Sequence, residues 1–138
     1  MDIGIALSGG IDSSAIALGT RHLNPDKEIH AFSFIADDQE SSEEYWIDLV
    51  SKEANLISHK VKPSSNELIG DFEELIYYED HPCGDFGIYP QHRVSKLAKK
   101  KGIKVLLSGE GGDEIFSGYT GFASAYIASL VCQCKFLE

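Results

Sequence analysis

Two glycine-rich stretches carry the residues whose types and spacing could do chemistry in this sequence. The first follows an apolar run and combines two glycines, three serines and one carboxylate: Ser8-Gly9-Gly10-Ile11-Asp12-Ser13-Ser14. Free backbone N–H groups and the helix dipole favour a bound polyanion at a helix N-terminus. Gly9 and Gly10 let the backbone approach such a ligand closely. The stretch therefore predicts a phosphate-binding loop between a strand and a helix.

Asp12 is the unusual member of this loop, because a carboxylate repels a phosphate unless a divalent cation lies between them. Two familiar phosphate loops are excluded. The Walker A loop requires a lysine before its Ser or Thr, and the dinucleotide fingerprint requires a third glycine. The alternative is an ordinary turn between a strand and a helix, capped by Asp or Ser.

The second stretch mirrors the first, because an apolar run again leads into serine, glycines and carboxylates: Ser108-Gly109-Glu110-Gly111-Gly112-Asp113-Glu114. If the two preceding strands are neighbours in a parallel sheet, both loops lie at one crevice beyond their carboxyl ends. Asp12 and Asp113 could then share one Mg²⁺ that bridges phosphate oxygens. The alternative is that Glu110, Asp113 and Glu114 are solvated loop acids.

The elements that must position these loops alternate between strand and helix patterns. The expected strands are Ile3–Leu7, Ile29–Ile35, Leu56–Val61 and Val105–Leu107. The expected helices are Ser13–Leu23, Ser41–Ala54, one opened by the capping box at Ser64, one begun at Pro90, and Tyr119–Val131. This order predicts an α/β fold: a Rossmann-like three-layer α/β/α arrangement with a parallel sheet in strand order 3-2-1-4.

Two further expectations concern details of these elements. Ile11, Ala15 and Leu18 share one face of the first helix, which we expect to be its apolar face. Gly109–Gly118 contains four glycines and is expected to be a loop.

The composition excludes several classes of protein. The chain has 138 residues and a net charge of −10, which speaks against general binding to nucleic acid or anionic membranes. No run of 18 apolar residues and no basic leader is present, so we expect no membrane span. The three cysteines, Cys83, Cys132 and Cys134, make no disulfide framework, and a reducing cytoplasm is the default location. An ATP-like anion would have to be held by local dipoles and a metal.

Taken together, the two loops resemble the signatures of a known enzyme family. The stretch from Ser8 to Ser14 is similar to the pyrophosphate-binding loop (PP-loop) of the ATP pyrophosphatase group. The stretch from Ser108 to Tyr119 resembles the second signature of the synthetase domain of glutamine-hydrolysing asparagine synthetase, a group that also contains β-lactam synthetase. The resemblance implies an adenine nucleotide α-hydrolase-like fold, with residues 1–138 as a single PP-loop ATP-binding synthetase domain.

The resemblance also implies how ATP and Mg²⁺ would be held. The residues implied to cradle the β- and γ-phosphates are Ser8, Gly9, Gly10 and Ser13. Asp12 and Asp113 would bind Mg²⁺ on the leaving pyrophosphate.

Further residues are implied to act nearer the reacting atoms. Phe34 would give backbone contacts to adenine, and Ser108 and Gly109 would lie near the ribose and α-phosphate. Glu110 would steer the attack of ammonia, so that Glu110 and Asp113 are the expected catalytic residues.

The implied reaction has two steps. A substrate carboxylate, aspartate or a similar one, attacks the α-phosphorus of ATP, and pyrophosphate leaves. Ammonia then displaces AMP from the mixed anhydride and forms an amide. The residues that would recognise the carboxylate lie in Tyr78–Tyr89 or beyond residue 138.

Departures from the family leave alternatives open. Residue 2 is Asp where the family has a cysteine nucleophile, so we expect no glutaminase domain in this chain. A separate glutaminase domain or subunit and a second copy of this chain are the candidate protein partners. One alternative function is an ATP- or AMP-binding module, or a fragment that needs a partner for turnover. Another is a different PP-loop enzyme, such as a tRNA-modifying thiolase or NAD synthetase, although these lack the second signature.

Overall fold

A computed structural model describes residues 3–38, 42–79 and 87–133 of the chain. It divides into two compact units, Met1–Ser108 and Gly109–Glu138, and each unit is described by itself. The expectation that residues 1–138 form one domain stays a prediction.

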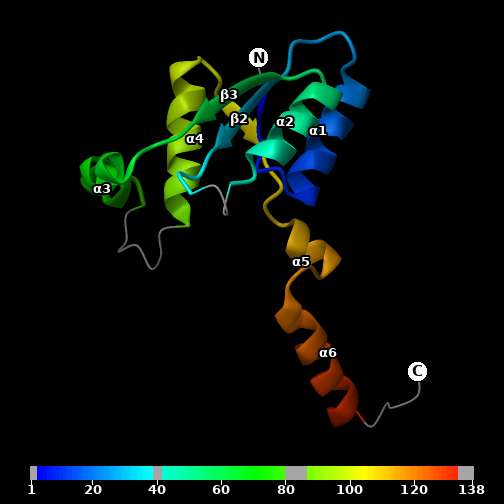
Figure 1. Cartoon of the computed structure of the whole chain (residues 1–138). Coiled ribbons are helices and arrows are strands. Elements are labelled where there is room, and N and C mark those ends of the chain that lie inside the picture. The colour runs from blue at the N-terminus through cyan, green and yellow to red at the C-terminus, as the bar shows by residue number, and fades with distance from the viewer. Residues whose placement is uncertain (1–2, 39–41, 80–86, 134–138) are drawn as a thin grey trace. The chain divides into compact units, whose positions relative to one another are not determined.

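A four-stranded parallel sheet forms the centre of the first unit (Figure 1). Its strands are β1 (Ile3–Ala6), β2 (His30–Phe34), β3 (Ile57–Val61) and β4 (Val105–Leu107). The hydrogen-bonded order is β3-β2-β1-β4 with every pair parallel. The predicted strand order is therefore confirmed. The carboxyl ends of the strands lie along one edge of the sheet, as parallel pairing requires.

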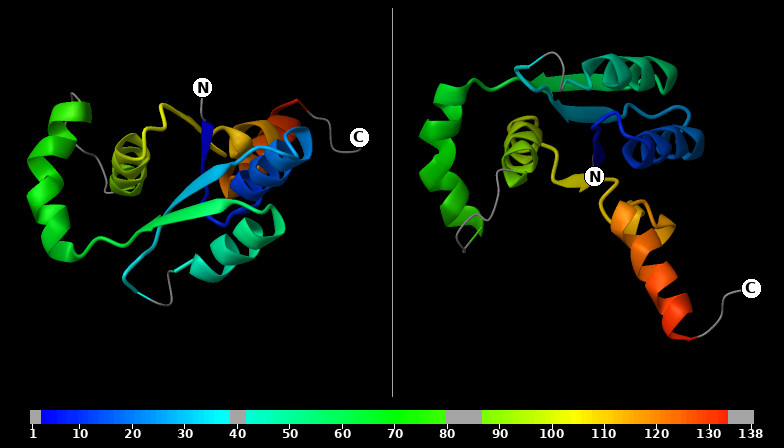
Figure 2. Two further views of the ribbon diagram at one scale, coloured as in Figure 1. Left: turned by 90° about the horizontal axis from the view of Figure 1, so that it is seen from above. Right: turned by 60° about the horizontal axis from the view of Figure 1, so that its bottom comes forward.

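Helices cover both faces of this sheet (Figure 2). On one face, α1 (Ile11–Leu23) and α2 (Glu44–Glu53) bury a cluster that includes Ile5 and Leu7. On the other face, α4 (Ile88–Lys100) packs over Phe32, and α3 (Ser65–Glu79) lies against α4. Successive residues of β1 and β2 alternate between the two clusters, which confirms the expected three-layer α/β/α fold.

The buried face of α1 differs from the expectation. Ile11, Ala15 and Leu18 are exposed, whereas Ser13 and Ala17 are buried. The expected apolar face was therefore wrong. The Ser13 hydroxyl bonds to neighbouring loop atoms, so burial of this polar side chain is compensated, and the face it shares with Ala17 turns toward the sheet.

The second unit contains two helices, α5 (Gly112–Phe116) and α6 (Thr120–Cys132). The expectation of a loop over Gly109–Gly118 is corrected, since five of these residues are helical. The stretch Gly112–Cys132 has a mean hydropathy of 1.3 and is long and apolar enough to cross a membrane by length and composition alone. The core helices of soluble proteins meet the same criterion, so length and composition alone do not assign a membrane span. The stretch nevertheless differs from the expectation that the chain has no segment of this kind.

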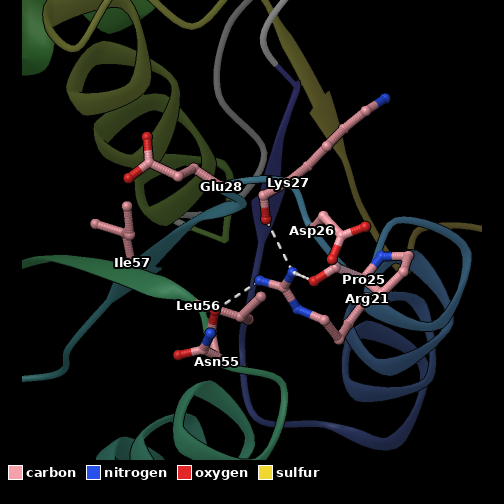
Figure 3. Close-up of a pocket in the computed structure, with 8 residues that line it drawn as sticks. All are labelled: Arg21, Pro25, Asp26, Lys27, Glu28, Asn55, Leu56 and Ile57. Carbon is pink, nitrogen blue, oxygen red and sulfur yellow. Dashed lines mark hydrogen bonds between the residues drawn. The ribbon is translucent and has the colours of Figure 1, made fainter.

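Arg21 ties together the amino-terminal edge of the sheet (Figure 3). Its guanidinium donates to the carbonyl oxygens of Ala54 and Asn55 at 2.7 Å, before β3. It also donates to three carbonyl oxygens in the turn before β2, those of Asn24, Pro25 and Lys27. The side chain lines a hollow of about 290 Å³ at the edge of the sheet opposite the loop from Ser8 to Ser14. Since its donors are already used, we assign this hollow to structure rather than to ligand binding.

We expect Arg21→Lys to lower the free energy of unfolding by about 2–3 kcal/mol, because an ammonium cannot reach carbonyls on both turns. Urea denaturation measures this change. The matched control is Lys27→Ala, which removes an exposed side chain and leaves the accepting Lys27 carbonyl in place. Equal stabilities of the Arg21 and Lys27 variants would contradict the structural role.

A histidine pair crosses from β2 to β3. The Nδ1 atom of His30 lies 2.9 Å from Nε2 of His59, so one ring donates a hydrogen bond to the other. Desolvation, followed by the charges of Lys101 and His30, lowers the pKa of His59 below 6.5. Two protonated rings would both present N–H groups and could not form this bond.

We expect the folded state to lose stability as the pH falls below about 6.5, because the unfolded chain then binds the His59 proton more tightly than the folded chain. The contribution is fully present above that pH. Denaturation between pH 5 and 8 should show a shallower slope in His59→Gln. The control is His22→Gln, at an exposed position of α1. An unchanged slope in His59→Gln would argue against the linkage.

Candidate active site

The first glycine-rich loop begins directly after β1 and is held by serine hydroxyls. The Ser8 and Ser13 hydroxyl oxygens lie 3.0 Å apart, and the Ser8 hydroxyl accepts the N–H of Gly10 at 3.3 Å. The Ser13 and Ser14 hydroxyls donate to the Gly10 carbonyl at 3.1 and 2.7 Å. These bonds use up the Gly10 carbonyl and fold the loop back on the first turn of α1.

The N-terminus of α1 opens into this loop. Its first helical bond runs from the N–H of Ser14 to the carbonyl of Gly10 at 3.0 Å. The preceding N–H groups, those of Ile11, Asp12 and Ser13, therefore have no carbonyl of their own helix to bond. The N-cap residue is Gly10, which has no side chain that could accept a hydrogen bond from these donors. This end of α1 can accept an anion.

Gly9 lies against the first turn of α2. It has a φ of 89°, and a Cβ atom there would come within 3.0 Å of the Trp46 Cβ and 3.3 Å of the Glu43 carbonyl oxygen. Any side chain would be strained by the backbone and would collide with a helix. The Trp46 side chain is 55% exposed beside this contact. It is the single tryptophan of the chain and marks the loop spectroscopically.

Phe34 and Ser108 reach the same edge of the sheet from the neighbouring strands. Phe34 ends β2, and Ser108 follows β4, whose Leu107 is in register with Ile5 of β1. The half-buried Phe34 ring meets the ring of Tyr89 edge-on, with centroids 6.3 Å apart. The first unit therefore gathers these positions beside the first loop.

An ionic cluster between α3 and α4 holds the Tyr89 hydroxyl in place. The Tyr89 hydroxyl donates to Asp71 of α3 at 3.0 Å, and Arg93 of α4 also donates to that carboxylate. Partial burial raises the pKa of Asp71, but hydrogen bonds from Arg93, Lys96 and Tyr89 outweigh it and hold the pKa below its usual range. The cluster joins α3 to α4.

The second glycine-rich loop is described within the second unit. A Cβ atom at Gly118 would come within 2.0 Å of the Asp113 carboxylate. The carboxylate therefore packs directly against the backbone of Gly118, where no side chain would fit. The Gly118 N–H donates to the Asp113 carbonyl at 3.0 Å. The Tyr119 hydroxyl donates to Glu114 at 3.0 Å, and this bond, with the charge of Glu114, raises the pKa of Tyr119.

The predicted site residues therefore divide between the two units. The first unit holds Ser8, Gly9, Gly10, Asp12, Ser13, Phe34 and Ser108. The second holds Gly109, Glu110 and Asp113. Within the described ranges no group of three or more His, Cys, Asp or Glu side chains is placed to hold a metal. A cation at Asp12 or Asp113 would have to take most of its ligands from phosphate oxygens and water.

Two contacts of this site are absent from the sequence-based prediction. Trp46 lies beside Gly9, and Tyr89 lies beside Phe34. The sequence pattern indicates only that Trp46 belongs to the apolar repeat of α2, and it gives no sign of the contact with Gly9. Residues 80–86, within the expected substrate loop Tyr78–Tyr89, lie outside the described residues.

The chain is similar to known proteins over most of its length. The family described as asparagine synthase matches residues 1–132, including both loops. A putative glutamine-hydrolysing asparagine synthetase of Mycobacterium bovis is 40% identical over 120 residues, 86% of this chain and 18% of that protein. The putative glutamine-hydrolysing asparagine synthetase 2 of Methanocaldococcus jannaschii is 34% identical over 141 residues, 99% of this chain and 26% of that protein.

Asparagine synthetase 1 of Bacillus subtilis, also named as glutamine-hydrolysing, is 34% identical over 122 residues, 85% of this chain and 18% of that protein. The chain thus spans about a fifth to a quarter of the length of these relatives. The family match extends over nearly the whole chain and contains both loops. The chain therefore belongs to the asparagine synthase family.

Proposed function

We propose that this chain provides the ATP site of an asparagine synthetase-like, AMP-forming ligase. The observation that carries the proposal is the loop from Ser8 to Ser14, in which the N-terminus of α1 is open and Gly9, without a side chain, lets the loop pack on α2. The family match supports ATP as the nucleotide. Location in the cytoplasm belongs to the same proposal.

In the proposed reaction the first loop binds the β- and γ-phosphates, and the backbone of Phe34 binds adenine. A carboxylate oxygen of aspartate or a similar substrate attacks the α-phosphorus, and the bond between the α-phosphorus and its bridging oxygen breaks. The N–H groups of α1 stabilise the negative charge that develops on the departing pyrophosphate. Ser108 and Gly109 hold the ribose and α-phosphate.

Ammonia then attacks the acyl carbon, and the bond to AMP breaks. Glu110 accepts a proton from the attacking nitrogen, so that a neutral amide forms. The ammonia would come from a glutaminase domain or subunit, as the names of the relatives suggest.

Mg²⁺ bound by Asp12 and Asp113 would neutralise charge on the pyrophosphate. Two features support it. Asp12 lies in the first turn of α1, beside the free N–H groups, where a carboxylate without a cation would repel phosphate. In addition, no ion pair to Asp12 or Asp113 is found within the described residues.

Trp46 makes the proposal directly testable. Titration of the chain with ATP and Mg²⁺ should change the Trp46 fluorescence, because this side chain borders Gly9. Gly9→Ala should abolish the change, because a Cβ atom there collides with α2 and distorts the loop. Pyrophosphate release is then measured with a panel of carboxylates that includes aspartate, with and without ammonia.

Binding without pyrophosphate release under any of these conditions would leave a nucleotide-binding module. Absence of binding would reject the proposal. Tight tRNA binding that weakens steeply with salt would instead favour a tRNA-modifying PP-loop enzyme.

Substitution of Asp12 and of Asp113 tests whether a cation binds between them. We expect Asp12→Asn to weaken ATP binding at least tenfold with Mg²⁺ present, but not with Mg²⁺ chelated, because the amide neither binds the metal nor repels phosphate. Asp113→Asn should act in the same direction. Isothermal titration measures both, with the exposed Asp26→Asn as control. Wild-type affinity for ATP with Mg²⁺ in both variants would rule out the shared cation.

A further inference from the structure

The backbone at the end of β2 is tied to a neighbouring strand on one side only. The N–H of Leu7 donates to the carbonyl of Phe32 at 2.9 Å, and this is the last backbone bond from the β1 segment to β2 among the described residues. On the other side, the N–H of Ile35 donates to the carbonyl of Val61 at 2.9 Å. Successive residues of a strand direct their backbone groups to alternate sides, so the N–H and carbonyl of Phe34 face the β1 side, beyond that last bond.

The position of Phe34 therefore depends on its side chain as well as on β3. The ring is half-buried on the face of the sheet that α4 covers, and it packs against the cluster around Phe32. It meets the ring of Tyr89 edge-on, with centroids 6.3 Å apart and planes at 78°. Such edge-on pairs have a preferred geometry, because the positive edge of one ring faces the negative face of the other. A shift of Tyr89 would therefore shift the end of β2.

Tyr89 is itself held firmly at the start of α4. It is only 5% exposed, and its hydroxyl donates to the Asp71 carboxylate at 3.0 Å. Asp71 also accepts hydrogen bonds from Arg93 and from Lys96. The guanidinium carbon of Arg93 lies 5.9 Å from the centroid of the Tyr89 ring. Both the ring and the hydroxyl thus have fixed partners, and charge-assisted bonds of this kind are costly to break.

The backbone groups of Phe34 match the edge of an adenine base. Adenine presents an N–H donor at N6 beside an acceptor at N1, so one residue's carbonyl and N–H can bond to both. Hydrogen bonds weaken steeply when their distance or angle departs from the optimum. A base bound in this way gains affinity only while the end of β2 keeps its position.

We propose that Tyr89 is a positioning residue for the nucleotide base. Its ring, tied to Asp71, holds Phe34 and thereby the backbone groups that bind adenine, while Tyr89 itself touches no part of the nucleotide. This inference rests on the proposed function, because it assumes that ATP binds with its base at Phe34. It predicts that Tyr89 contributes to the binding of the base and not to the binding of the phosphates.

Isothermal titration tests the proposal by comparing ATP with inorganic tripolyphosphate, each in the presence of Mg²⁺. Both ligands use the loop from Ser8 to Ser14, but only ATP uses the end of β2, so the ratio of the two affinities reports the base contact. Tyr89→Leu removes the ring, and we expect it to lower this ratio about fivefold or more while tripolyphosphate binding stays unchanged. The matched control is Tyr77→Leu, at an exposed tyrosine of α3, which should leave the ratio unchanged.

Two milder variants keep the test decisive if circular dichroism shows that Tyr89→Leu does not fold. Tyr89→Phe keeps the ring but removes its bond to Asp71, and it should lower the ratio about twofold to threefold. Phe34→Leu keeps the backbone groups and removes the ring that Tyr89 contacts, and it should lower the ratio about fivefold, as Tyr89→Leu does.

Four outcomes would contradict the proposal. One is an unchanged ratio in the folded variants. Another is an equal loss of ATP and tripolyphosphate binding, because Tyr89 would then act only on the packing of α3 and α4. Equal affinities of the unaltered chain for the two ligands would overturn this inference alone and leave phosphate binding in place. Absence of binding by either ligand would reject the proposed function, and this inference with it.

Discussion

The candidate site of the first unit depends on the parallel pairing of β1 with two neighbours. Because β2 and β4 both run in the direction of β1, the chain leaves all three strands at one edge of the sheet. Ser8, Phe34 and Ser108 follow or end these strands, and none of them lies near the others in the sequence. The turns at the opposite edge are tied by Arg21 instead. One edge therefore serves stability, and the other carries the positions that the proposed function uses.

At the ligand edge, backbone groups rather than side-chain charges would have to hold an anion. The chain carries a net charge of −10, so its overall field repels ATP. In the proposed site the free N–H groups of α1 offset this repulsion, and the close contact of Gly9 with α2 fixes the position of the loop. Asp12 would repel a phosphate bound in this loop unless a cation lay between them, and for this reason the proposed ATP site includes Mg²⁺.

The sheet order and the three layers could be predicted because buried parallel strands form continuous apolar runs, and turns and caps separate them from helices. The buried face of α1 could not be predicted from hydropathy. Ser13 is buried because its hydroxyl finds partners in the loop, and only the folded loop provides them. Trp46 and Tyr89 were missed for a related reason, since their contacts with Gly9 and Phe34 join segments that are distant in the sequence.

The two units differ in how far they can act alone. The first has a core on each face of its sheet and needs no further segment to shape the loop around Gly9. Among the described residues of the second unit no side chain is buried, so packing within that unit does little to hold the backbone that carries Glu110 and Asp113. Nucleotide binding and turnover therefore have different structural requirements. In the proposed function, phosphate binding draws on the first unit alone, while amide formation also needs Glu110 and Asp113 of the second unit.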